Sequence, residues 1–496
     1  MGVMDQGFPT PLVVSLLPAV WMLSPVVCRV AVAALLLALT LPRMAQRGMF
    51  GDGLVYATIA RNLAIGSGSF WAPRYTETAW AEFYEHPPLG LALEAAAFGL
   101  LGDHLIVERA FSLIVLGLHA LVIALIWRRV QPAALDWLPL LFWLMPSIVS
   151  WGAVNNMLEN TQALFTSVAV LLLLDALRAP DREAAVMRAA AAGVAVVAAV
   201  LTKGPVGFFP LAAPLLFHLL PEAGPNKTRH SRRFAVMATS CLVVGAFAVA
   251  LIAYPPSRRN LTMYFETHLS PALQGLRDVS DPLAIVRHLA LGVIGRMTVL
   301  LALCWWLGRR NARARKATFA AGALFFLTLG LCAAAPIAIS PKVSGHYFLP
   351  AIPMFALGFA SIAHRFVVTP LESRRPAMVS AVTLALASIL ALVFLFGPGR
   401  SRDAVMLRDL DAIDRVMPRD LTIGACRHPR SSRDWGLHTY TQRWFRVSLD
   451  ARDIPINGWL LRLGEDCAAP PSCLPVARGD TLTLFRCPDS LQRTSK

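Results

Sequence analysis

Long apolar runs separated by short polar turns recur along almost the whole chain. Many of these runs approach the 17–25 residues that a helix needs to cross the hydrocarbon core of a bilayer. Eleven such runs lie near 30–48, 105–127, 134–150, 157–177, 187–202, 205–220, 234–254, 289–308, 317–339, 347–363 and 377–398. The run at 187–202 is short, which leaves a tilted or partly re-entrant helix open. The pattern predicts an α-helical polytopic membrane protein with about eleven transmembrane helices in residues 30–398.

The segment before the first run, residues 1–29, is an apolar N-terminal extension. Residues 11–27 are apolar and Arg29 follows them, a pattern that fits either an interfacial helix or an additional span. No basic stretch precedes the apolar one, so we do not expect a cleaved signal peptide.

The composition changes after the last apolar run. Residues 399–496 are more charged and contain short stretches typical of strands, such as Leu421–Ala425 and Thr481–Phe485. We therefore predict a small C-terminal α/β domain. Its four cysteines suggest two disulfides in an oxidising compartment, in any of three pairings, with free buried cysteines as the alternative. These cysteines are Cys426, Cys467, Cys473 and Cys487.

The overall composition supports the bilayer as the solvent. Of the 496 residues, 56% are hydrophobic and 15% are charged, against about 25% charged residues in a typical soluble protein. Soluble, fibrous and disordered classes are therefore excluded. The formal net charge of +16 would suggest nucleic-acid binding in a soluble protein, so its distribution along the chain matters.

The basic residues gather in alternate loops. They are Arg128, Arg129, Arg178, Arg182, Arg188, Lys227, Arg229, Arg232, Arg233, Arg309, Arg310, Arg313, Arg315, Lys316, Arg365, Arg374 and Arg375. The opposite turns carry a single lysine, Lys203 or Lys342, or no basic residue, as around Asn155. The positive-inside rule makes the basic loops cytoplasmic. The first loop (49–104), a loop at 255–288, the two lysine turns and the C-terminal domain then lie outside the cytoplasm, and we expect no nucleic-acid partner.

The first outside loop contains a candidate catalytic carboxylate. Asp52 begins a stretch in which Val55, Ile59 and Leu63 recur at i, i+4 and i+8. This spacing predicts an amphipathic helix lying on the membrane surface. Asp52 is a candidate for chemistry, and a helix N-cap is the plain alternative.

A second candidate site in the same loop is Glu85-His86-Pro87-Pro88. The prolines disfavour helix before them and favour the start of a helix, so Glu85 and His86 are expected to be extended at a helix entrance. A helix N-terminus attracts anions, and a carboxylate there is also a good cap. Both a functional and a capping role for Glu85 remain open.

The lysines are conspicuous because the chain uses arginine almost everywhere else. Only five lysines occur among 46 Lys and Arg residues, and two of them, Lys203 and Lys342, occupy short outside turns. A lysine ammonium is a compact point charge suited to phosphate. The alternative is a lysine that snorkels at the end of a span. Gly204 and Pro205 favour an exposed, shaped turn at Lys203.

The order of these motifs resembles the GT-C superfamily of membrane glycosyltransferases over about residues 30–400. The motifs are Asp-x-x-x-Tyr (Asp52, Tyr56), Glu85-His86-Pro-Pro-Leu, Leu-Thr-Lys203-Gly-Pro, and Lys342-x-x-x-His346-Tyr347-Phe-Leu-Pro, with Ser69-Phe70-Trp71-Ala72-Pro73 between the two carboxylates. The chain is most similar to the bacterial branch of aminoarabinose transferases and protein mannosyltransferases, glycosyltransferase family 39-like. Members of this branch transfer a sugar from a polyprenyl phosphate to an acceptor outside the cytoplasmic membrane.

The resemblance implies roles for individual residues. Asp52 matches the catalytic aspartate of the first loop, and Glu85 matches the second carboxylate. Lys203 and Lys342 match basic residues that face the donor phosphate, and His86 stands where aminoarabinose enzymes have a lysine. The branch often has a second acid after the first-loop aspartate, where this chain has Gly53. Both departures weaken the case for aminoarabinose as the sugar.

Further polar residues lie where a substrate cavity is expected. Asn155, Asn156, Glu159 and Asn160 begin the fourth predicted span at its outer edge, and polar groups at membrane depth usually face the interior. Tyr56, Asn156, Glu159, His346 and Tyr347 are the candidates for the cavity, with a role in an interfacial aromatic belt as the alternative for the last two.

These observations predict a glycosyltransferase of the bacterial cytoplasmic (inner) membrane. The expected partners are a polyprenyl-phosphate sugar donor, membrane lipids and an acceptor, either a cell-envelope glycolipid such as lipid A or lipopolysaccharide or, alternatively, a protein that is O-glycosylated. We expect inverting single displacement and no cofactor, because no carboxylate cluster suggests a metal site. A transporter is less expected, since the charged candidates lie in outside loops and at span ends and the chain lacks a repeated half.

Overall fold

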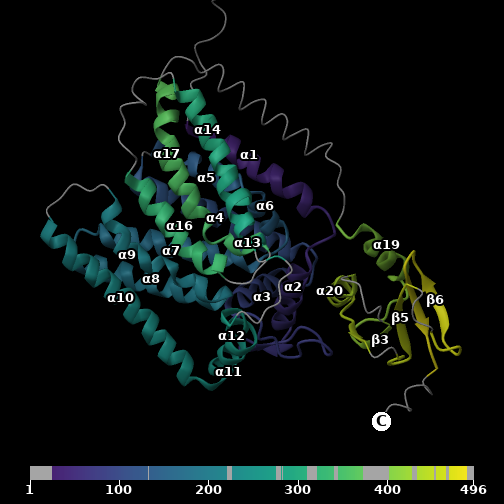
Figure 1. The fold of residues 1–496 in the computed structure, drawn as a ribbon. Coiled ribbons are helices and arrows are strands. Elements are labelled where there is room, and N and C mark those ends of the chain that lie inside the picture. Colours follow the sequence, from purple (N-terminus) through teal and green to yellow (C-terminus); the bar gives the residue numbers. More distant parts are fainter. Residues whose placement is uncertain are drawn as a thin grey trace, which may run out of the picture.

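The computed structural model describes residues 25–131, 133–220, 226–274, 281, 283–309, 321–339, 344–372, 402–426, 433–451, 454–464 and 469–488. It consists of a large helical part and a smaller C-terminal domain with a sheet, which lies at one side of the helical part (Figure 1). The predicted fold class is therefore confirmed in outline. The predicted span at 377–398 and the boundary at residue 399 fall outside the described residues.

The helical part follows the predicted order of apolar segments. Its longer helices are α1 (Pro25–Met44), α4 (Val107–Val130), α7 (Leu158–Leu177), α8 (Arg182–Lys203), α10 (Asn226–Ala253), α14 (Arg296–Gly308), α16 (Ala321–Ile339) and α17 (Ile352–Glu372). Shorter helices join them: α5 (Trp137–Leu144), α6 (Ser147–Val154), α9 (Ala213–Leu216), α11 (Pro255–Tyr264), α12 (Ser270–Leu273) and α13 (Ala284–Arg287). Tighter or wider turns occupy η1 (Ala133–Leu135), η2 (Pro205–Ala212), η3 (Phe217–Leu219), η4 (Phe265–Leu269), η5 (His288–Gly295) and η6 (Gly345–Phe348).

The predicted count of eleven transmembrane helices is not confirmed. Within the described residues, five helices are long and apolar enough to cross a membrane, or six if a bent pair is counted as one span. The bent pair is α5 and α6, which occupy the predicted span 134–150 and meet at 79°. Pro146 lies between them, and proline lacks the N–H that would continue the helix. The count of eleven is not confirmed, whereas a multi-pass helical membrane protein is.

Two predicted spans have a different form. The segment 205–220 is not one long helix, because Pro205, Pro210 and Pro214 interrupt it and it folds as η2, α9 and η3. The segment 187–202, predicted to be short, belongs to the longer α8. Asp181 caps this helix by accepting a hydrogen bond from the Ala184 N–H at 2.7 Å, so α8 begins before the apolar run does.

The loop predicted to be the first outside the cytoplasm folds into two helices, α2 (Gly51–Ala64) and α3 (Leu89–Leu101), with a short hairpin of β1 (Gly68–Ser69) and β2 (Ala72–Pro73) between them. The helix after Pro87-Pro88 is confirmed. The expected surface position of the first helix is wrong, because every residue from Gly53 to Asn62 is buried. α3 packs on α2, and so does α20 of the C-terminal domain, which supplies the cover that an amphipathic pattern alone does not reveal.

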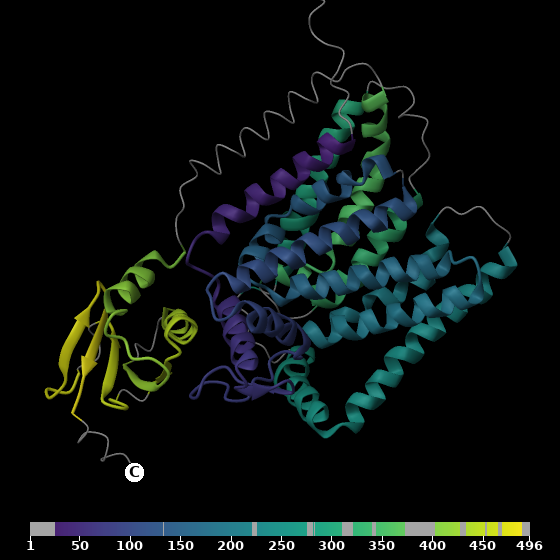
Figure 2. The same ribbon diagram turned by 180° about the vertical axis from the view of Figure 1, so that it is seen from behind.

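The C-terminal domain is the predicted α/β unit. Its sheet has the strand order β4-β3-β5-β7-β6, with β3 parallel to β4 and β5 and the remaining pairs antiparallel. The strands are β3 (Thr422–Cys426), β4 (Ser448–Asp450), β5 (Trp459–Leu463), β6 (Leu474–Arg478) and β7 (Leu482–Arg486), and the helices are α19 (Ala404–Ile413) and α20 (Arg433–Phe445). α20 lies between the sheet and α2, as both ribbon views show (Figures 1 and 2). Met49 and Leu54 of the first loop pack into the apolar core of this domain.

The C-terminal domain contains disulfide bonds. Cys473, just before β6, is bonded to Cys487, just after β7. Cys426 is disulfide-bonded as well. Cys467 lies outside the described residues.

These disulfides provide a test of the side of the membrane on which the domain lies. We expect Cys473 and Cys487 to resist a membrane-impermeant maleimide in intact cells and to react after reduction, because a disulfide offers no thiolate. Mass spectrometry of the labelled peptides measures the result. Labelling of intact cells without reductant would contradict the disulfide. Labelling that requires permeabilised as well as reduced cells would place the domain in the cytoplasm.

Candidate functional site

Lys203 ends α8 at the centre of the candidate site. Gly204 follows it with φ +94°, a conformation that favours glycine, and Pro205 prevents the helix from continuing. A Cβ atom at position 204 would lie 2.2 Å from the hydroxyl oxygen of Tyr264. Only glycine therefore lets the chain turn here while α11 packs closely against it.

The ammonium group of Lys203 is surrounded by polar side chains from three other elements. Its Nζ donates to the Tyr56 hydroxyl at 2.8 Å, lies 3.1 Å from Nε2 of His86, and is 3.2 Å from Oε1 of Glu159. The Lys203 side chain is only 7% exposed. His86 also lies 3.0 Å from the Tyr56 hydroxyl, so the three groups form one cluster. Lys203 is thus a buried charge with specific partners, unlike a lysine that snorkels into water.

Glu159 connects this cluster to the turn that follows α16. It lies in the first turn of α7, 1% exposed, and its Oε1 is 3.6 Å from Nε2 of His346 as well as close to Lys203. The His346 ring is stacked on Trp151, with centroids 5.6 Å apart, and Tyr347 lies next to it with ring centroids 4.4 Å apart. The structure therefore brings Tyr56, His86, Glu159, Lys203 and His346 together from separate parts of the chain. Lys342, which precedes this turn, lies outside the described residues.

Asp52 lies on α2, one helical turn before Tyr56 and therefore on the same face. Burial raises the pKa of the Asp52 carboxyl, the nearby charge of Lys203 opposes this rise, and the charge of Glu159 adds to it. Phe50, not Asp52, is the N-cap of α2, and no side chain caps this helix end. The capping alternative for Asp52 is therefore wrong. Burial also raises the pKa of Tyr56 well above its usual range, which keeps its hydroxyl a hydrogen-bond donor at neutral pH.

Glu85 lies beside the cluster. Its Oε1 is 3.6 Å from Nε2 of His268, and its side chain is 30% exposed. The rings of His268 and Tyr264 are stacked, and His86 lies 6.3 Å from His268 between ring centroids. Glu85 therefore faces the α11–α12 segment. Sequence reasoning missed Tyr264 and His268, because nothing in their spacing links them to residues near 85 or 204.

The structure explains why glycine follows Asp52. A Cβ atom at position 53 would lie 2.0 Å from the carbonyl oxygen of Asn155, so the backbone of α2 approaches the backbone at the end of α6 closely. The side chain of Asn156 strengthens this contact by donating to the Gly53 carbonyl at 3.3 Å and to Glu94 at 2.7 Å. A second acid at position 53 is sterically excluded in this packing, and Asn156, a cavity candidate, is engaged in holding helices together.

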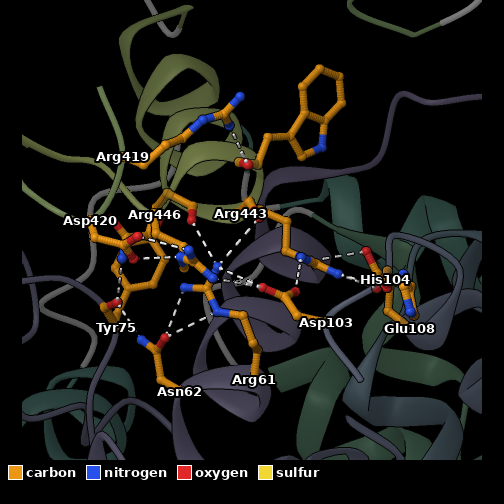
Figure 3. Close-up of polar contacts among 12 residues, drawn as sticks. Arg61, Asn62, Tyr75, Asp103, His104, Glu108, Arg419, Asp420, Arg443 and Arg446 are labelled. Atoms are coloured by element: carbon orange, nitrogen blue, oxygen red, sulfur yellow. Dashed lines mark hydrogen bonds and ion pairs between the residues drawn. The ribbon is translucent and has the colours of Figure 1, made fainter. Parts of the chain in front are cut away.

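The C-terminal domain contacts α2 and the start of α4 through buried charges (Figure 3). Arg443 of α20 donates to Asp103 at 2.8 Å and to Glu108 at 3.0 Å, and its side chain is 2% exposed. Arg61 of α2 donates to the backbone carbonyls of Gln442 and Arg443 at 3.2 and 3.4 Å. Burial lowers the pKa of Arg61 to about 10, so it still carries its charge at neutral pH. The helix that carries Asp52 and Tyr56 is therefore fixed from the C-terminal domain as well as from α3.

Tyr440, a neutral side chain at this interface, can be used to test whether the C-terminal domain anchors the segment before α2. The Tyr440 hydroxyl of α20 accepts from the Met49 N–H at 3.0 Å and donates to Asp403 at 2.8 Å, which connects the domain to the residues just before α2. Tyr440→Phe removes both hydrogen bonds and should lower the free energy of unfolding by about 1–2 kcal/mol. Thermal denaturation measures this, with Tyr84→Phe as the control, because Tyr84 is half-buried and its hydroxyl donates to Glu82 in the same loop. Equal melting temperatures for both variants would contradict the anchoring role.

Within the described residues, no group of three or more His, Cys, Asp and Glu side chains is arranged to hold a metal ion.

Comparison with known proteins places the fold. No protein-family model matches the chain, and no curated protein sequence does. The structure is similar to that of ArnT from Cupriavidus metallidurans bound to undecaprenyl phosphate, with a TM-score of 0.64 and 17% identity over 93% of this chain and 98% of that one. The apo form of the same ArnT matches over the same shares, with a TM-score of 0.58 and 16% identity. The oligosaccharyltransferase AglB from Archaeoglobus fulgidus, in complex with an inhibitory peptide and a dolichol-phosphate, also matches. The match covers 76% of this chain and 55% of that one at 15% identity, and its TM-score of 0.41 is too low to establish a common fold. The chain therefore has the fold that the ArnT structure has.

Proposed function

We propose that this protein transfers a sugar from a polyprenyl-phosphate donor to an acceptor at the outer face of the cytoplasmic membrane. The observation that carries the proposal is the buried ammonium group of Lys203, which lies between Tyr56 and His86. Tyr56 is one helical turn from Asp52 on α2. The ArnT structure of the same fold was obtained with undecaprenyl phosphate bound, which supports a polyprenyl phosphate as the donor.

Lys203 is suited to the departing phosphate. When a polyprenyl-linked sugar leaves its carrier, negative charge develops on the phosphate, and a preorganised cation stabilises that charge in the transition state. Glu159 neutralises Lys203 at 3.2 Å. The Tyr56 hydroxyl supplies a second donor, His86 a third when it is protonated, and Lys342 is proposed to add another charge from the neighbouring turn.

Asp52 is suited to accept a proton. Burial raises the pKa of its carboxyl, and a carboxylate with a raised pKa is a stronger general base. With an acceptor hydroxyl in reach, Asp52 takes the hydroxyl proton while the oxygen attacks the anomeric carbon and the phosphate leaves, which inverts that carbon. An acceptor that is itself a phosphate needs no base, and Asp52 then orients it. We propose that Glu85, beside His268, is the second carboxylate of the site.

We propose a cell-envelope glycolipid, such as lipid A or lipopolysaccharide, as the acceptor, and protein O-glycosylation as the second candidate. The resemblance of the motif order to the aminoarabinose-transferase branch supports the first candidate. The identity of the sugar stays open, because Gly53 and His86 stand where aminoarabinose enzymes have other residues. Position 53 tolerates only glycine in this packing.

A deletion strain distinguishes the acceptors. Mass spectrometry of its envelope glycolipids and glycoproteins is expected to show a sugar missing from the glycolipid, restored by the wild-type gene and not by a gene carrying Asp52→Asn. A sugar missing only from a glycoprotein would establish the second candidate. If the purified protein moves a labelled solute across vesicles and transfers no sugar from polyprenyl phosphate, the glycosyltransferase proposal fails.

The pH dependence of the reaction reports on Asp52. Activity should fall as the pH drops through the raised pKa of Asp52, because protonation removes the base. The charge of Glu159 contributes to that rise, so Glu159→Gln should move the acid limb of kcat/KM to lower pH. The pH profile of sugar transfer measures this, with Glu77→Gln in the same loop as the control. An unmoved acid limb would mean that another group titrates.

A further inference from the structure

A cavity separate from the Lys203 site lies where the C-terminal domain meets the turn between α3 and α4. Its volume is about 290 Å³, and Arg47, Arg419, Asp411, Asp414, Leu105 and Trp444 are among the residues that line it. None of the residues in the Lys203 cluster lines this cavity. It therefore needs an explanation of its own.

The cavity offers both signs of charge in exchangeable pairs. Arg47 contacts Asp411 at 2.7 Å, and Arg419 contacts Asp414 at 2.7 Å. All four side chains are between 45% and 53% exposed. Such exposed ion pairs contribute little to stability, so a ligand's own charges can replace the partners at small cost. A third pair, Arg443 with Asp103 at 2.8 Å, also lines the cavity, but Arg443 is only 2% exposed. A ligand with one negative and one positive group would satisfy the four more exposed side chains at once, whereas a simple anion would leave Asp411 and Asp414 facing it.

The position of the cavity favours a membrane lipid over a soluble molecule. α4 has 24 residues, which corresponds to a length of about 36 Å and suffices to span the hydrocarbon core of a bilayer. It begins at Val107, so Leu105 at the cavity lies at the level of the membrane surface. Beside the cavity, Leu100 is 86%, Leu101 52% and Ile106 70% exposed. These exposed apolar side chains flank Leu105 along the chain, and a charged cavity next to an apolar patch suits a lipid head group and its acyl chains.

We propose that this cavity binds the head group of a phosphatidylethanolamine molecule of the outer leaflet. The phosphate lies between Arg47 and Arg419, in charge-assisted hydrogen bonds. The ammonium group is bound by Asp411 and Asp414, and the acyl chains cover the patch of Leu100, Leu101, Leu105 and Ile106. The lipid then joins the C-terminal domain to the membrane next to α2. Arg47 also lies over the Trp444 ring at 4.5 Å, which holds its guanidinium at the cavity wall.

The test is a lipid titration of the full-length protein followed by native mass spectrometry, a readout that does not depend on sugar transfer. Phosphatidylethanolamine is expected to bind at least tenfold more tightly than phosphatidylglycerol, because only the former supplies the ammonium group. Arg47→Gln combined with Arg419→Gln should weaken phosphatidylethanolamine binding about tenfold or more. Arg408→Gln is the matched control, since Arg408 belongs to an exposed ion pair with Asp480 on the same domain.

A second variant separates the two charges. Asp411→Asn combined with Asp414→Asn should reverse the preference and favour phosphatidylglycerol, since the two arginines then face an anion without competition from these two carboxylates, while Asp103 stays paired with Arg443 at 2.8 Å. Equal binding of both lipids to the wild type, or unchanged affinities in both double variants, would overturn the proposal. Binding of soluble glycerophosphoethanolamine as tight as that of the lipid would overturn the role of the apolar patch and of the membrane.

Discussion

Replacement of Lys203 by arginine is expected to slow sugar transfer about a hundredfold while expression and membrane insertion stay normal. The ammonium group fits between Tyr56, His86 and Glu159 at 2.8 to 3.2 Å in a pocket that leaves it 7% exposed. A guanidinium is larger and planar and cannot place one compact charge at the same point. A lost charge–phosphate contact in the transition state costs about 3 kcal/mol, which corresponds to roughly a hundredfold in rate.

The measurement is single-turnover transfer of a radiolabelled sugar from polyprenyl phosphate by purified protein. Lys227→Arg is the matched control, because it makes the same change at the start of α10, at the end of the helix predicted to face the cytoplasm. We expect Lys342→Arg to lower the rate at least tenfold as well. If Lys203→Arg transfers sugar as fast as the wild type, the phosphate role fails and Lys203 serves only as the structural partner of Glu159.

The sequence predicted the order of elements because apolar periodicity depends on local pattern. The helices from α4 to α17 follow the predicted runs, and β3 and β7 coincide within one residue with the strand-like stretches around 421 and 481. The predictions that were wrong depend on how one element packs against another or where a helix breaks. The pattern of Val55, Ile59 and Leu63 shows one apolar face of α2, but it does not show that α20, more than 370 residues later, covers another face. Likewise, hydropathy did not show that Pro146 splits an apolar run into α5 and α6.

The candidate site was predictable as a set of residues but not as an arrangement. Motif order identified Lys203, His86 and Tyr56 separately, and the fold places them within 3.1 Å of one another. Glu159 was a weaker candidate because a single acid at a span end has no distinguishing spacing, yet it holds the buried ion pair with Lys203. Tyr264 and His268 gave no signal at all, since their proximity to Gly204 and Glu85 depends on how α11 and η4 pack against distant segments.

Asp52→Asn is expected to lower the rate of transfer to a hydroxyl acceptor about a thousandfold, the largest effect in this set. Asparagine preserves the size of the side chain but cannot accept the proton, and general base catalysis contributes about 10²–10⁴ in rate. The fold should not suffer, because Asp52 does not cap α2. Burial raises the pKa of Asp52, so the wild-type carboxylate costs stability increasingly as the pH rises through that pKa. The asparagine variant loses this cost, and its melting temperature at neutral pH should equal or exceed that of the wild type.

The two readouts together separate catalysis from structure. Glu77→Gln is the matched control, because Glu77 is an exposed acid of the same loop, paired with Arg74 at 3.3 Å, and its loss should change neither rate nor stability. A slow but stable Asp52→Asn variant assigns the base. A variant that transfers sugar at nearly the wild-type rate would mean that the acceptor attacks already deprotonated, as a phosphate would, and that Asp52 only orients it. A variant that is slow because its melting temperature has fallen would contradict both roles, since the buried carboxylate would then be needed for the fold.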